Sequence, residues 1–176
     1  RSASRDNRMC PISDSSFKCL SEVGWPHNFR VFLRPLGGEC LRASLARLVS
    51  CLRFMKPDVC VFHSGVNDIS RNSVATEILS LFSDSVPLFA SLLAPDADVK
   101  LIFSSLFQTR VPSMNICVRE ANNVLRIMCV ESSWVYLSND MIFQSDLRDD
   151  VHLDTSGIVK IHRNIVHAIQ SVFGLT

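Results

Sequence analysis

The chain has 176 residues, about the size of one ordinary domain, and 47% of them are hydrophobic, which is enough for a sizeable core. Eighteen basic and 17 acidic residues leave a formal net charge of +1, so charge points neither to nucleic acid nor to an anionic membrane. No run of 18 apolar residues is present, and no apolar stretch of a signal peptide follows the polar residues 1–8. We expect residues 1–8 to be a flexible tail or the end of a linker, and residues 9–176 to form a single domain.

The seven cysteines are odd in number, and no two of them have the C-x-x-C spacing. Several lie within apolar patterns, which is typical of buried free thiols in a reducing compartment. We therefore expect an intracellular, cytoplasmic protein. A zinc site would need clustered cysteine and histidine spacings, which the sequence lacks, so no metal ion and no cofactor are expected.

Hydrophobic periodicity predicts strands that alternate with helices. The predicted strands are residues 9–13, 29–34, the beginning of 57–68, 99–105 and 134–137, and the predicted helices are 17–20, 39–55, 72–94, 114–131 and a last helix capped by Thr155-Ser156. Pro57 is expected to end the second helix, and Pro87 to kink or split the third. This alternation predicts an α/β fold with a parallel sheet and helices on both faces.

Several polar breaks fall just after predicted strands, and so at one edge of the sheet. They are Ser13-Asp14-Ser15, Gly37-Gly38, Gly65-Val66-Asn67-Asp68 and Asp149-Asp150-Val151-His152. Together they bring a serine, a histidine, an aspartate and several N–H donors to this edge. These are the components of a serine hydrolase.

Asp149 and His152 are three residues apart in a loop, and a turn brings residues at this spacing together. The carboxylate of Asp149 can then accept a hydrogen bond from one ring nitrogen of His152 and fix its tautomer. The other ring nitrogen can take the proton of Ser15. Asp150 is the neighbouring candidate, although adjacent side chains tend to point in different directions.

Four blocks, in this order, resemble those of the SGNH (GDSL-type) hydrolases. Ser13-Asp14-Ser15 resembles the block that holds the nucleophile, and Gly38 resembles the glycine that donates a backbone N–H. Gly65-Val66-Asn67-Asp68 resembles the G-x-N-D block, and Asp149-Asp150-Val151-His152 resembles the D-x-x-H block. Any one block is a common string, but four in order, each after a predicted strand, are fairly specific. The resemblance covers residues 9–173.

The resemblance implies a three-layer α/β/α sandwich with a five-stranded parallel sheet, the flavodoxin-like SGNH hydrolase fold. It implies a triad of Ser15, His152 and Asp149, and an oxyanion hole formed by Ser15, Gly38 and the side chain of Asn67. The implied substrate is a small, short-chain acyl ester, of the acetyl type, on a lipid or a carbohydrate. A lipid or membrane surface is the further partner that this substrate class suggests.

One position departs from the family pattern, because Ser13 stands where the nucleophile block begins with glycine. Glycine there permits a tight turn, whereas serine fits only if its φ angle stays negative. The basic leading residues and the cysteine-rich sequence also resemble the SGNH domains in first-open-reading-frame proteins of some vertebrate non-LTR retrotransposons. In such a protein, nucleic-acid binding is not expected of this domain, and self-association would use regions outside this chain.

The alternative is a catalytically weak or inactive module on the same fold that binds RNA or protein, since fold does not fix function. Its local basic patch would be Arg30, Arg34, Arg42 and Arg47. Each site residue also has a structural interpretation: Ser15 as a helix cap, Gly38 as the end of a strand, Asn67 as a turn residue and His152 as a surface residue. The joint presence of serine, aspartate and histidine favours the esterase.

Two other groups lie near the predicted site. His63 is expected to be a core histidine. The apolar cluster Met141-Ile142-Phe143 either packs onto the core or forms a lip that contacts an acyl chain or a lipid. Leu106, Phe107 and Val111, after the fourth strand, are placed to face the same site.

Overall fold

The structure is a computed structural model, and it describes residues 7–13, 20, 24–26, 29–32, 34–35, 40–70, 75–92 and 99–175. The strands are β1 (Asn7–Ser13), β2 (Phe29–Val31), β3 (Arg34–Pro35), β4 (Val59–His63), β5 (Lys100–Ser104) and β6 (Val135–Leu137). The helices are α1 (Leu41–Ser50), the π-helical turn η2 (Cys51–Met55), α2 (Val66–Ser70), α3 (Ala75–Leu92), α4 (Pro112–Glu131), the 3-10 turn η3 (Gln144–Asp146) and α5 (Thr155–Val172). Apart from Leu20, the predicted helix at residues 17–20 falls outside the described residues.

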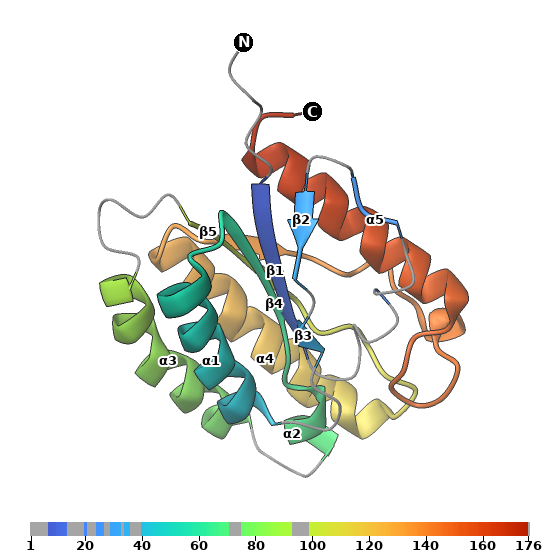
Figure 1. Cartoon of the computed structure of the whole chain (residues 1–176). Coiled ribbons are helices and arrows are strands. Elements are labelled where there is room, and N and C mark those ends of the chain that lie inside the picture. Colours follow the sequence, from blue (N-terminus) through green and yellow to red (C-terminus); the bar gives the residue numbers. More distant parts are fainter. Residues whose placement is uncertain are drawn as a thin grey trace.

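The sheet has the order β2-β1-β4-β5-β6, and every pairing in it is parallel. β3 also pairs with β1, further along the same side as β2, so the strands occupy five positions. Figure 1 shows α5 on one side of the sheet and α1, α3 and α4 on the other. The predicted three-layer sandwich with a five-stranded parallel sheet is therefore confirmed.

Successive side chains along the buried strands point to opposite faces of the sheet, and so they contribute to two separate cores. Along β4, Cys60 and Phe62 belong to the core beneath α1, α3 and α4, whereas Val59 and Val61 belong to the core beneath α5. All four side chains are at most 2% exposed, as expected for a central parallel strand covered on both faces. This double coverage explains why the run from Val59 to Phe62 is continuously apolar.

The second predicted strand differs from the structure, because residues 29–34 form two short strands instead of one. The backbone N–H of Phe32, between them, still donates to the carbonyl of Met9 over 2.9 Å. Pro35 was expected to lie beyond the strand, but it is the last residue of β3. A proline has no backbone N–H to donate, and this is tolerated at the edge of a sheet.

Helix ends also differ from the predictions. The second helix leaves α-geometry at Cys51, which was not predicted, but its π-helical turn ends at Met55 as expected. The C-cap residue Lys56 has a positive φ of 44° and comes one residue before Pro57. Helix α3 continues through Pro87, so the predicted split is wrong. Proline removes only one backbone hydrogen bond, and packing on neighbouring helices can hold the remaining turns. Asp154, rather than Thr155 or Ser156, caps α5 by accepting from the N–H of Gly157 over 2.8 Å.

Free cysteines are a further confirmed prediction. Six of the seven cysteines lie among the described residues, where they form no disulfide, and four of them are buried. Hydrogen bonds with Cys10 and Cys51, together with burial, raise the pKa of the Cys60 thiol well above its ordinary value. Burial alone raises the pKa of Cys129 to about 12. These thiols are therefore protonated at neutral pH.

No helix among the described residues is long and apolar enough to cross a membrane.

Candidate functional site

The predicted site residues follow the carboxyl ends of the parallel strands. In the strand register, Ser13 of β1 lies opposite Pro35 of β3 on one side and His63 of β4 on the other. Three of the four predicted blocks therefore begin at, or shortly after, the same level of the sheet, which Ser13, Pro35 and His63 define. Ser15 and Gly38 come two and three residues after this level in the sequence, and both lie outside the described residues.

Asn67 lies on α2, just beyond the end of β4 (Figure 1). The chain turns at Gly65, whose φ of 133° favours glycine, and enters this short helix directly instead of the predicted polar turn. Asp68 accepts a hydrogen bond from the backbone N–H of Leu41 over 2.7 Å and so joins α2 to the start of α1. The two polar residues of the block thus differ: Asp68 is buried and anchors α2, while Asn67 is half-buried at the sheet edge.

Asp149 and His152 contact each other as their spacing predicts. Nδ1 of His152 lies 3.0 Å from Oδ1 and 2.9 Å from Oδ2 of Asp149. The backbone N–H groups of Val151 and His152 also donate to Oδ1 of Asp149, over 3.0 and 2.8 Å. One carboxylate therefore holds both the loop and the ring, and it favours the tautomer that carries its proton on Nδ1.

The same contacts keep Asp149 ionised. Desolvation acts to raise its pKa, but the N–H groups of Val151 and His152 and the His152 ring outweigh this and lower the pKa to about 2. An anionic Asp149 stabilises the imidazolium that forms when His152 takes a proton. The side chains of His152 and Asp149 are 35% and 49% exposed, so the pair is open to a substrate from solvent.

A set of contacts that the sequence did not predict anchors the Asp149–His152 loop. Leu147 and Leu153 form an antiparallel bridge at its two ends, and the N–H of Arg148 donates to the carbonyl of His152 over 2.9 Å. From the loop after β5, the guanidinium of Arg110 donates to the carbonyl of Leu147, and its backbone N–H donates to the carbonyl of Asp150 over 2.9 Å. No sequence signal indicates these partners, because Arg110 lies far from the loop along the chain.

Asp146 ties the same loop to α5. Its carboxylate accepts from Lys160 Nζ over 2.7 Å, from the N–H of Phe143 over 2.9 Å and from Ser156 Oγ over 3.1 Å. Its side chain is only 4% exposed. Burial acts to raise the pKa of Asp146, but Lys160, the Phe143 N–H and Ser156 outweigh it and lower the pKa.

Gly157 lets α5 approach this anchor closely. A Cβ atom at this position would lie 2.5 Å from the carbonyl oxygen of Asp146 and 2.8 Å from Cδ2 of Leu153. Glycine to alanine within a helix normally stabilises by about 1 kcal/mol. Here we expect Gly157→Ala to destabilise by about 1–3 kcal/mol, because the backbone carbonyl must move.

Urea unfolding followed by circular dichroism tests this prediction. Gly24→Ala is the matched control, since nothing lies within 4 Å of a Cβ atom at Gly24. A Gly157→Ala chain at least as stable as wild type would show that α5 and the loop separate easily.

His63 is a core histidine, as expected. It is fully buried, its Nδ1 lies 3.3 Å from Oγ of Ser104, and its ring stacks on Phe107 at a centroid distance of 5.5 Å. Neighbouring elements thus hold this imidazole inside the sheet, which makes it a structural residue.

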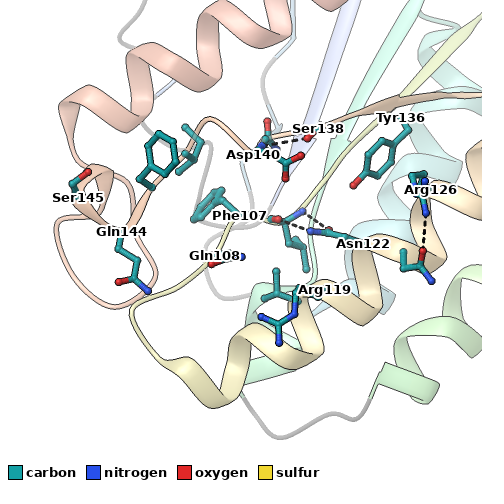
Figure 2. Close-up of a pocket in the computed structure, with 16 residues that line it drawn as sticks. Phe107, Gln108, Arg119, Asn122, Arg126, Tyr136, Ser138, Asp140, Gln144 and Ser145 are labelled. Carbon is teal, nitrogen blue, oxygen red and sulfur yellow. Dashed lines mark hydrogen bonds between the residues drawn. The ribbon is translucent and has the colours of Figure 1, made fainter.

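A cavity of about 860 Å³ opens between α4, β6 and the loops after β5 and β6 (Figure 2). Arg119 and Arg126 reach it from α4, and Tyr136 from β6. Among the described residues, Asp149 and His152 do not line it, but Gln144 does and also donates to the carbonyl of Thr109 over 3.1 Å. The cavity therefore borders residues 138–145, the part of the chain that precedes Asp149 and His152.

Three of the six apolar residues predicted near the site are buried, and all three also line the cavity. Leu106 and Phe107 line the cavity and are buried, whereas Val111 is not among its lining residues. Ile142 is 3% exposed and packs in the core beneath α5, as the structural interpretation expects. Phe143 is 60% exposed at the cavity wall, which fits the alternative of a contacting lip.

Comparison with solved structures identifies the fold. No protein-family model matches the chain, and no curated protein matches it. Among solved structures, a catalytic mutant of Axe2, an acetylxylan esterase from Geobacillus stearothermophilus, has a TM-score of 0.73 at 16% identity, covering 100% of this chain and 98% of that one. A lipase/acylhydrolase from Enterococcus faecalis has a TM-score of 0.72 at 14% identity, covering 94% and 96%.

A member of the lipolytic protein G-D-S-L family from Veillonella parvula has a TM-score of 0.74 at 14% identity, covering 93% of this chain and 98% of that one. Identities this low carry information about the fold and not about the reaction. With the strand order, they show that this chain has the fold of the SGNH (GDSL-type) hydrolases.

Proposed function

We propose that the protein is a serine esterase that hydrolyses short-chain acyl esters. The observation that carries this proposal is the Asp149–His152 pair, with Nδ1 of His152 held 2.9 Å from the Asp149 carboxylate. The esterase and acylhydrolase among the structures with the same fold support it. Ser15 is the nucleophile, His152 the general base and Asp149 the residue that positions His152.

Acylation begins when Oγ of Ser15 attacks the ester carbonyl and its proton passes to Nε2 of His152. The carbonyl oxygen becomes an oxyanion, which accepts from the backbone N–H groups of Ser15 and Gly38 and from the amide of Asn67. Each such donor is typically worth about 10²–10³ in rate. His152 then gives its proton to the leaving alcohol, and the acyl group remains on Ser15.

Deacylation repeats these steps with water. His152 takes a proton from the water molecule as its oxygen attacks the acyl carbon, and the same three donors hold the second oxyanion. When this intermediate collapses, His152 returns its proton to Oγ of Ser15 and the carboxylic acid leaves. No step in this sequence needs a metal ion or an organic cofactor.

The substrate class we propose is an acetyl-type ester on a carbohydrate or a lipid. The cavity that borders residues 138–145 is lined by polar and cationic side chains such as Gln108, Arg119 and Arg126, which suit the hydroxyl groups of a sugar or the head group of a lipid. The exposed ring of Phe143 at its wall gives an apolar contact. A retrotransposon protein in which other regions bind nucleic acid is the setting we propose for this domain.

Two measurements test the proposal: turnover of p-nitrophenyl acetate, and labelling by a fluorophosphonate, which reacts covalently with an activated serine. We expect the wild-type chain to turn over the ester and to carry the label on Ser15. Ser15→Ala should lose both, whereas the control Ser16→Ala, a change at the next residue, should keep both. Turnover no faster than buffer, or equal rates for wild type and Ser15→Ala, would refute this mechanism.

A further inference from the structure

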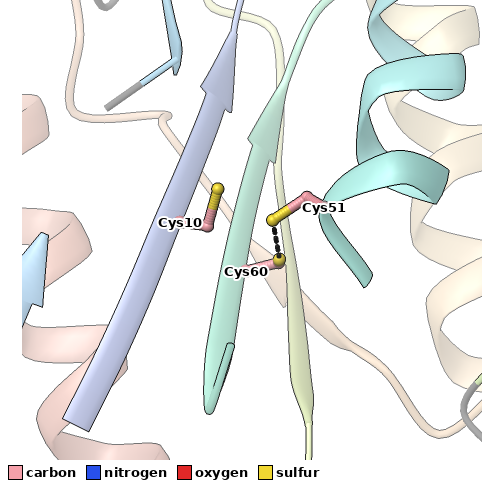
Figure 3. A group of neighbouring side chains, drawn as sticks. All are labelled: Cys10, Cys51 and Cys60. Carbon is pink, nitrogen blue, oxygen red and sulfur yellow. Dashed lines mark hydrogen bonds between the residues drawn. The ribbon is translucent and has the colours of Figure 1, made fainter. Parts of the chain in front are cut away.

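Three cysteines that are distant in the sequence meet in the core between the sheet and α1. Cys10 lies on β1, Cys60 on β4, and Cys51 is the first residue of η2. Their Sγ atoms all lie within 4.8 Å of one another, and those of Cys51 and Cys60 are 3.7 Å apart. Figure 3 shows Cys51 reaching from the end of the helix toward the two strands.

The fold itself creates this cluster. Cys10 and Cys60 are direct partners in the parallel register, so their side chains stand side by side on the same face of the sheet. The change from α- to π-helical geometry at Cys51 occurs just where this side chain meets them, and π-helical turns are frequent at functional sites. Cys10 and Cys60 are fully buried, and Cys51 is 5% exposed.

The spacing and the surroundings select the kind of ion that would fit. Metal–sulfur bonds are about 2.3 Å long, so three sulfurs around one ion stand about 4 Å apart, close to the spacing of this cluster. The cluster lies in an apolar core, and its three members offer only sulfur ligands, which favours a soft ion.

We propose that Cys10, Cys51 and Cys60 bind one Cu(I) ion in three-sulfur coordination. Thiolate ligands favour Cu(I) and zinc, but structural zinc takes four ligands, and the cluster among the described residues offers three. Each sulfur binds Cu⁺ as a thiolate, so three-sulfur binding releases three protons to solvent. No electron is transferred in this step.

A hollow in the surface borders the cluster on the side of Cys51. This hollow of about 350 Å³ is lined by Arg47, Ser50, Cys51, Phe54 and Met55. Cys51 thus belongs both to the hollow and to the cluster. Met55, which lines the same hollow, carries a thioether, a soft ligand of the type that Cu(I) favours.

Competition with the Cu(I) chelator bathocuproine disulfonate, without oxygen and with ascorbate, measures binding to the purified chain. X-ray absorption at the copper edge then identifies the ligands. We expect one Cu(I) per chain and a shell of three sulfurs. A shell containing nitrogen or oxygen, a failure to compete with the chelator, or tighter binding of Zn(II) in a parallel titration would overturn the proposal.

Variants locate the site. Cys51→Ala should weaken Cu(I) binding by at least about tenfold, by comparison with the 10–100-fold effects of even outer-shell changes. Cys129→Ala is the matched control, because Cys129 is also a buried free thiol but does not belong to the cluster. Equal binding by the two variants would contradict the proposal, and the absorption spectrum of wild type decides it even if a variant fails to fold.

Discussion

Replacing Asp149 by asparagine is expected to lower kcat/KM for p-nitrophenyl acetate by about 10⁴-fold, the loss typical of a triad histidine held in the wrong tautomer. An asparagine oxygen in place of Oδ1 can still accept from the N–H groups of Val151 and His152, so the turn survives. The amide nitrogen then takes the place of Oδ2, which lies 2.9 Å from Nδ1 of His152. An N–H donor there forces the ring proton onto Nε2, and His152 can no longer accept the proton of Ser15.

The control is Asp150→Asn, which removes the same charge from the same loop. Asp149 makes both carboxylate contacts to Nδ1 of His152, so Asp150→Asn should retain nearly full activity. Steady-state kinetics of both variants, with circular dichroism to verify folding, make the comparison. Equal losses would assign the effect to charge alone, and an unchanged Asp149→Asn would show that another group orients His152.

Features that depend on local sequence could be predicted. Alternation and apolar runs locate the strands, because a central parallel strand such as β4 must be apolar on both faces. The Asp149–His152 contact spans only three residues, so spacing alone indicates it. The catalytic roles of Ser15, Gly38 and Asn67 stay predictions until kinetics test them.

Features that depend on register or on distant packing could not be predicted. No metal site was expected, because the cysteines and histidines are not clustered along the sequence. The pairing of Cys10 with Cys60 and the change in helix geometry at Cys51 nevertheless bring three thiols together. Asp146 and Lys160 are 14 residues apart, and only the docking of α5 onto the loop makes them partners. Neither arrangement leaves a periodic pattern in the sequence.

Asp146→Asn is expected to have the second large effect, a decrease of about 3 kcal/mol in the free energy of unfolding. This value is at the lower end of the range for removing one partner of a buried ion pair. The amide supplies only one acceptor oxygen, so Lys160, the Phe143 N–H and Ser156 cannot all keep their contacts. The Lys160 side chain is 36% exposed and can turn toward water, which limits the loss. Urea unfolding measures it, and Asp140→Asn, an exposed change in the preceding loop, should stay within about 0.5 kcal/mol of wild type.

The same residue gives a pH test with a defined sign. The folded state lowers the pKa of Asp146 below its ordinary 3.8, so its contribution to stability is fully present above that pH and is lost as pH falls through the folded value. Wild type should therefore lose more unfolding free energy than Asp146→Asn as the pH is lowered below 3.8. If the two lose stability in parallel, the Asp146 carboxylate is not held by these donors in solution. The loop that presents His152 would then have to be anchored mainly by Arg110 and the Leu147–Leu153 bridge.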